Sequence, residues 1–166
     1  IELSDKKIKP NKMQIEALQN IELLRLEGKK RALIISATGT GKTIISAFDF
    51  ARFYAKNPEA TFLFLAHREE ILKQAQSAYR GVLKNSHFGE LLVGRNKPSK
   101  YNQLFASIQS LNNQISTLSL SEDYYDYIAF CQKMAKLAFY FFDMYHTMAI
   151  VKKYFLLDKS RFYVSR

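Results

Sequence analysis

Apolar runs alternate with amphipathic stretches along the first 130 residues. Ala32–Ile35 and Phe62–Ala66 are apolar throughout, which is typical of strands that are buried on both faces of a parallel sheet. Between and around them, apolar residues recur at helical spacing, and Asn11 after Pro10 is a plausible helix start. The pattern predicts strands at 31–36 and 61–66 and helices at 10–27, 44–56 and 69–82.

Shorter apolar runs continue the alternation. We expect strands at 91–94 and 104–107 with a loop at 96–102 between them, and a candidate strand at 127–130. A helix is expected from Gln132 into the 140s. Strands that alternate with helices predict an α/β fold, a mainly parallel sheet with helices on both faces. Ligands bind such sheets at the carboxyl ends of the strands.

A glycine-rich loop joins the first predicted strand to the following helix. Residues 36–43 read Ser-Ala-Thr-Gly-Thr-Gly-Lys-Thr, and this context is typical of a phosphate-binding loop. Gly39 and Gly41 allow the backbone to curl around phosphate oxygens, and the helix start adds its positive dipole end. Lys42 is predicted to contact the β- and γ-phosphates and the Thr43 hydroxyl to ligate Mg²⁺. The loop residues predicted to bind ATP are Ser36, Ala37, Thr38, Gly39, Thr40, Gly41, Lys42 and Thr43.

The charge balance indicates an anionic partner. The chain has 25 Lys and Arg against 15 Asp and Glu, a formal charge of +10. This surplus suits nucleic acid better than ATP alone, although a solvated basic surface is the alternative. One cysteine, Cys131, excludes an internal disulfide and fits a cytoplasmic location. The late apolar stretch 137–151 is interrupted by Asp143 and His146, so no membrane span is expected.

Composition divides the chain near residue 129. Residues 1–128 are expected to form the ATP-binding domain, and residues 129–166 are richer in aromatic residues. We expect this tail to be helical and to pack on the domain or continue it.

Four segments, in this order, resemble the first motor domain of superfamily 2 helicases and translocases. The likeness is greatest to motor subunits of restriction enzymes of the type III res subunit kind. It covers residues 9–128 and lies in segments 10–18, 37–43, 64–72 and 105–111. The resemblance implies a RecA-like P-loop domain that uses ATP and Mg²⁺ and binds DNA through backbone contacts. It also implies a second motor domain or another subunit as a partner.

The resemblance assigns further site residues. Gln14 would bind the adenine edge, which its amide suits because it both donates and accepts hydrogen bonds; a surface glutamine is the alternative. His67, Arg68, Ser107 and Gln109 would contact the nucleic-acid backbone without reading its sequence. Alternatively, Arg68 pairs with a nearby carboxylate, and Ser107 and Gln109 are ordinary polar residues after a strand.

One motif of the family is missing from its expected place. The family carries Asp-Glu after an apolar strand that follows a phrase like Tyr125–Ile128, and here Ala129–Cys131 stands instead. A partial match to this motif is the apolar run 139–146, where Asp143 is followed by Met144 in the place of the glutamate. Alternatively, Ile128–Cys131 resembles the opening of the family's second motor domain, which would imply a deletion that joins the two domains. An altered reading frame is a further explanation of the missing motif. The simplest interpretation is that the tail forms a helix that packs on the domain.

These observations favour an ATP-binding motor domain of a DNA helicase, translocase or restriction enzyme. Lys42 and Thr43 are the predicted catalytic residues, stabilising phosphate charge and holding Mg²⁺. Without the water-orienting glutamate, we expect nucleotide binding with little hydrolysis. The alternatives are a non-catalytic nucleotide- or nucleic-acid-binding remnant, or another P-loop phosphotransferase, whose arginine-rich lid is not recognisable here.

Overall fold

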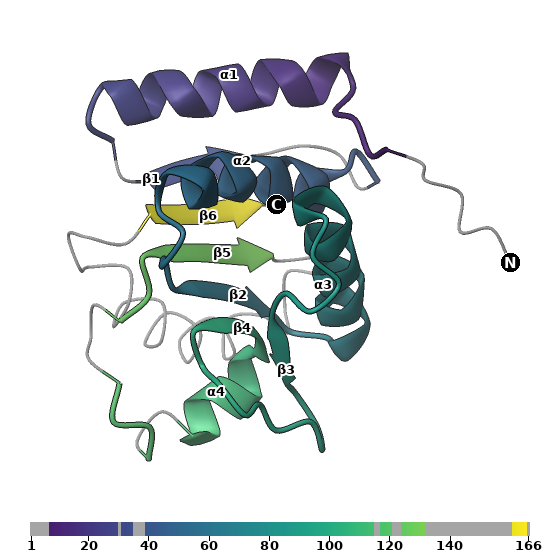
Figure 1. Cartoon of the computed structure of the whole chain (residues 1–166), viewed down its shortest axis with the longest axis vertical. Helices are drawn as coiled ribbons and strands as arrows, with labels where there is room; N and C mark the ends of the chain where they lie inside the picture. Colours follow the sequence, from purple (N-terminus) through teal and green to yellow (C-terminus); the bar gives the residue numbers. More distant parts are fainter. Residues whose placement is uncertain are drawn as a thin grey trace, which may run out of the picture.

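The computed structural model describes residues 7–29, 31–34, 39–114, 117–120, 124–131 and 161–165. Within these ranges the chain forms helices and strands in alternation (Figure 1). The helices are α1 (Lys12–Leu26), α2 (Lys42–Lys56), α3 (Glu69–Leu83) and α4 (Ile108–Gln114). The strands are β1 (Arg31–Ile34), β2 (Phe62–Ala66), β3 (Glu90–Leu92), β4 (Gln103–Ser107), β5 (Tyr127–Cys131) and β6 (Arg161–Ser165).

The strands form one sheet in the order β1-β6-β5-β2-β4-β3. Every neighbouring pair in this sheet is parallel, and β2 lies at the centre, where Phe64 faces Phe105 of β4 and Ala129 of β5. Since the strands run in one direction, their carboxyl ends share one edge, where the glycine-rich segment after β1 and the residues after β2 and β4 follow.

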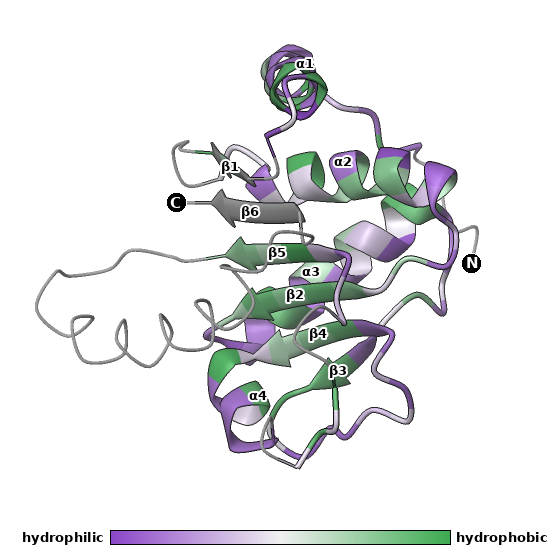
Figure 2. Cartoon of the chain, turned by 90° about the vertical axis from the view of Figure 1, so that its left-hand side faces the viewer, coloured by the Kyte–Doolittle hydropathy of each residue, from purple (hydrophilic) through white to green (hydrophobic). Residues whose placement is uncertain are grey.

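Helices cover both faces of the sheet. Side chains of successive strand residues point to opposite faces, so Phe62 and Phe64 of β2 pack in the cluster of α2 and α3, while Leu63 and Leu65 pack in the cluster of α4. All five residues of β2 are buried. Figure 2 shows the described central strands in the green of hydrophobic residues and the helices in mixed colours. The predicted α/β architecture is therefore confirmed.

Helix α1 lies at the periphery of the core, on α2 and the end strand β1, and contributes Leu18 and Ile21 to the cluster of α2 and α3 (Figure 1). Asn11 caps its start: the Asn11 side chain accepts from the Gln14 N–H, and the Gln14 side chain accepts from the Asn11 N–H, both at 2.9 Å. This reciprocal arrangement satisfies two of the N–H groups that a helix start leaves open. Only a narrow side of α1 is buried.

The predicted elements agree with the structure within a few residues, with two additions. Helix α4, directly after β4, and strand β6, between β1 and β5, were not predicted from the sequence. Residue 128, the expected domain boundary, falls inside β5, and β6 brings part of the expected helical tail into the sheet as a strand. The helix predicted from Gln132 and the end of the first strand at 35–36 lie outside the described residues.

No helix in the described part of the chain combines the length and apolar character needed to cross a membrane.

Candidate functional site

The phosphate-type loop leads directly into α2. Gly39 and Gly41 have φ values of +83° and +77°, in the left-handed region that glycine adopts without steric cost. Gly41 is the N-cap of α2 and has no side chain to cap it, so the helix start presents N–H groups and its positive dipole end at the loop. Lys42 and Thr43 are the first two residues of the helix. Ser36, Ala37 and Thr38 lie outside the described residues.

Gln14 reaches the loop from α1. Its amide Nε2 donates to the Thr40 carbonyl over 3.4 Å, and its side chain is buried. A Cβ added to Gly41 would lie 2.3 Å from Gln14 Nε2, so a glycine at this position is what allows the close approach. An open hollow lies between the start of α1 and the loop. It is lined by Asn11, Lys12, Met13, Gln14, Gly39, Thr40 and Gly41.

A second, small hollow lies beneath Lys42 and Thr43. Its other lining residues are Ser46, several apolar residues and Cys131 at the carboxyl end of β5. Burial raises the pKa of the Cys131 thiol, and the nearby Lys42 ammonium offsets part of this rise. Among the described residues that line this hollow there is no carboxylate. Cys131 belongs to the run Ala129–Cys131, which stands where the resemblance places the Asp-Glu motif.

The chemistry of these groups fits a nucleotide with its magnesium ion. In the described ranges no cluster of three or more His, Cys, Asp and Glu could hold a metal by itself. Magnesium in nucleotide sites is held by phosphate oxygens, waters and one or two protein ligands, so the Thr43 hydroxyl meets the requirement only when phosphate is also bound.

The residues predicted to contact nucleic acid stand at the same edge of the sheet. His67 and Arg68 follow β2, and Arg68 is exposed at the N-cap position of α3 in extended conformation. Gln109 is exposed in the first turn of α4. Ser107 differs, because it is buried at the end of β4 and its Oγ accepts from the Ser110 N–H at 3.0 Å. The structure gives its hydroxyl a capping role in α4.

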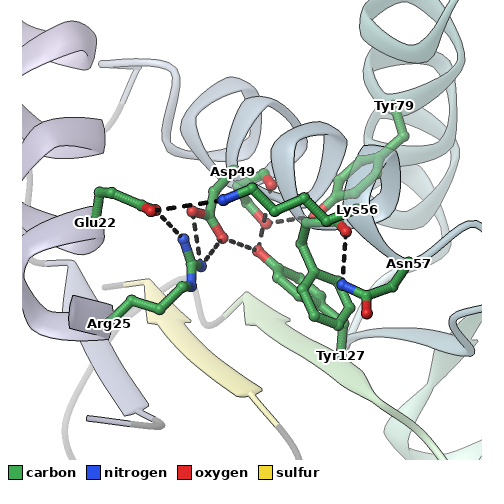
Figure 3. Close-up of polar contacts among 9 residues, drawn as sticks. Glu22, Arg25, Asp49, Lys56, Asn57, Tyr79 and Tyr127 are labelled. Atoms are coloured by element: carbon green, nitrogen blue, oxygen red, sulfur yellow. Dashed lines mark hydrogen bonds and ion pairs between the residues drawn. The ribbon is translucent and has the colours of Figure 1, made fainter. Parts of the chain in front are cut away.

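Sequence reasoning missed a buried polar network between α1, α2 and β5 (Figure 3). Asp49 of α2 is 1% exposed, and both its oxygens accept from Arg25 Nη2, at 2.8 and 2.7 Å. The Tyr127 hydroxyl donates to the same carboxylate at 3.1 Å. One signal was available: Asp49 stands between Phe48 and Phe50 in the apolar pattern of α2, and a charge there needs a partner.

Sheet, loop and helix start together define the fold class: an α/β domain of the RecA-like P-loop kind. The chain belongs to the family of the Type III restriction enzyme, res subunit, whose family model matches residues 7–153. Among curated proteins, no sequence matches this chain.

Solved structures of helicases and restriction enzymes share the fold. The UvsW helicase from bacteriophage T4 is 15% identical over 95% of this chain and 52% of its own, with a TM-score of 0.65. The Pyrococcus furiosus Hef helicase domain is 15% identical over 94% of this chain and 32% of its own, with a TM-score of 0.66. The Type ISP restriction-modification enzyme LlaGI, determined with a DNA substrate mimic, is 16% identical over 96% of this chain and 17% of its own, with a TM-score of 0.58. The chain spans about half of these structures or less, and the likeness concerns the fold.

Proposed function

We propose that this chain is the ATP-binding motor domain of a DNA helicase, translocase or restriction-enzyme motor, and that it binds Mg-ATP at the loop between β1 and α2. The observation that carries the proposal is the helix start: two left-handed glycines are followed by Lys42 and Thr43 in the first turn of α2. Gln14 meets the same loop from a helix that begins far away in sequence.

Each group has a distinct part in binding. The loop N–H groups and the Lys42 ammonium hold phosphate oxygens, and the Thr43 hydroxyl is a ligand for the ion. The Gln14 amide uses one N–H on Thr40 and one lone pair on Asn11, and an amide has a second of each. These remaining groups face the adenine edge in our proposal. Bound magnesium supplies charge neutralisation of the phosphates.

The proposal includes DNA as the second ligand. It is supported by the net charge of +10, by exposed Arg68 at the carboxyl edge, and by the fold shared with an enzyme determined with a DNA mimic. His67 and Gln109 would add backbone contacts, and Ser107 would act through α4. A second motor domain or another subunit completes the motor, and the setting is cytoplasmic.

Calorimetry tests the nucleotide site. Titration of the chain with Mg-ATP should give saturable binding, and Lys42→Ala should weaken it at least tenfold because a charge-assisted phosphate contact is worth roughly 1.5–3 kcal/mol. Lys73→Ala is the matched control, since Lys73 is an exposed lysine on α3 that pairs with Glu69. Equal affinity of the Lys42 variant and the unaltered chain would refute the site.

A second candidate is a module that binds ATP without turning it over. The observation that favours it is Cys131 in the hollow with Lys42 and Thr43, where a carboxylate is expected. A thiol with a raised pKa neither holds magnesium as a carboxylate does nor orients water. Phosphate release measured with and without duplex DNA separates the two functions: stimulated turnover favours the motor, and background release favours the binding module.

A further inference from the structure

Helix α1 is attached to the rest of the molecule by few apolar contacts. Leu18 and Ile21 are its buried apolar residues, whereas Leu23 and Leu26 are 58% and 76% exposed. Burial of two apolar side chains fixes the orientation of a helix only weakly, because the hydrophobic effect is not directional. The orientation of α1 therefore depends on its polar attachments.

Apart from a long ion pair of 3.9 Å between Glu22 and the exposed Lys56, the described contacts give α1 two polar attachments, one near each end of the helix. Near the start, Gln14 donates to the Thr40 carbonyl of the phosphate loop. Near the end, Arg25 places Nη2 on both oxygens of Asp49 and Nη1 on Glu22, at 2.6 Å. Eleven residues separate Gln14 from Arg25, so the two lie about 16 Å apart along the axis and within about 20° of the same side. Together the attachments hold one face of α1 against α2 and against the loop that precedes it.

The Arg25 attachment is rigid. The carboxylate of Asp49 is buried and also accepts from Tyr127 of β5, and an arginine paired in this way has a defined direction. In the same region, the hydroxyls of Ser46 and Tyr79 are hydrogen-bonded to each other, which links α2 to α3. Asp49 is therefore fixed to the core, and a shift of the Arg25 end would tilt α1 and move Gln14 over the loop.

We propose that Arg25 and Asp49 are positioning residues for the nucleotide base. They touch neither phosphate nor base; they set the tilt of α1, which places the Gln14 amide beside the adenine. The inference rests on the proposed function, and it assigns base preference to a pair far from the phosphate loop. Lys42 and Thr43 stand on α2 itself, so a tilt of α1 changes phosphate binding less than it changes the base contact of Gln14.

The test compares two ligands that share phosphate chemistry. Affinities for Mg-ATP and for magnesium with inorganic triphosphate are measured by calorimetry on the whole chain, and their ratio reports the base contact alone. Gln14→Ala sets the reference loss of this ratio. Arg25→Lys keeps the charge but loses the two-oxygen contact, and it should lower the ratio at least fivefold while triphosphate affinity stays within twofold.

A matched control and a second variant complete the design. Lys56→Met removes an exposed cation that lies 3.9 Å from Glu22 in the same junction and should leave the ratio unchanged. If Arg25→Lys does not fold by circular dichroism, Asp49→Asn, which keeps the shape, is measured in its place. A general loosening would weaken both ligands equally, and that outcome or an unchanged ratio would overturn the positioning role. Failure of the unaltered chain to bind either ligand would instead refute the proposed function and this inference with it.

Discussion

A methyl group at Gly41 should disturb the loop more than one at Gly39, and the difference measures the Gln14 contact. Both glycines have left-handed φ values, but a Cβ at Gly39 meets nothing within 4 Å, whereas a Cβ at Gly41 would lie 2.3 Å from Gln14 Nε2. Gly39→Ala therefore carries only backbone strain, about 1–2 kcal/mol. Gly41→Ala carries the same strain and also expels the Gln14 amide.

The extra cost follows from the contacts that Gln14 loses. The amide gives up its hydrogen bond to Thr40 and is drawn from the capping box with Asn11. Each is worth about 1 kcal/mol, so Gly41→Ala should lower the free energy of unfolding by about 1–2 kcal/mol more than Gly39→Ala does. Urea unfolding without nucleotide measures both values.

A double-mutant cycle separates strain from contact. With Gln14→Ala already present, Gly41→Ala should cost no more than Gly39→Ala, because no amide remains to be displaced. The reasoning is refuted by equal costs of the two alanines in the unaltered chain, or by a cost at residue 41 that Gln14→Ala does not reduce.

Three further predictions follow from particular contacts. Arg68→Ala should lower the salt dependence of duplex DNA binding by about one unit of slope, while exposed Arg52→Ala on α2 should not; no binding even at low salt would argue against DNA. Steady-state phosphate release should stay near background with or without DNA, and robust stimulation would mean that Asp143, Glu122 or Asp126 fills the acidic role. Hydrogen bonds from Ser99 and Lys100 hold the pKa of Glu90 below its usual 4.5, so its stabilising contribution is present above that pH and is lost as pH falls through the lowered value. Between about pH 6 and pH 3, the free energy of unfolding measured in urea should therefore fall less for Glu90→Gln than for the unaltered chain. An equal fall in both proteins would exclude Glu90 as a source of the pH dependence.

The sequence predicted the elements that have strong local signals. The apolar run of β2 needs burial on both faces, the Asn11 start has a capping signature, and the loop glycines need left-handed backbone; all three are in the structure. Strand β6 was not predicted, because it lies in the sheet only through pairing with β1 and β5, far away in sequence. Periodicity carries no information on such pairing.

The placement of the candidate site residues was predictable to a similar extent. Lys42 and Thr43 lie in the first turn of α2, where the local sequence pattern places them, and their roles in binding stay predictions. The pairing of Arg25 with Asp49 needs two helices to pack, and a sequence indicates only that a charge in an apolar face requires a partner. For Ser107, the capping of α4 depends on a helix that the pattern did not reveal.

The most direct test of the central claim locates bound nucleotide on the chain. Backbone amide resonances are followed by NMR as Mg-ATP is added to the unaltered protein. The amides of Gly39, Thr40, Gly41 and Lys42 and the side-chain amide of Gln14 should shift together and saturate, while those of Glu90 and Ser99, at the opposite edge of the sheet, should not move. No shift at millimolar ATP, or shifts confined to residues away from the loop, would contradict a nucleotide site between β1 and α2.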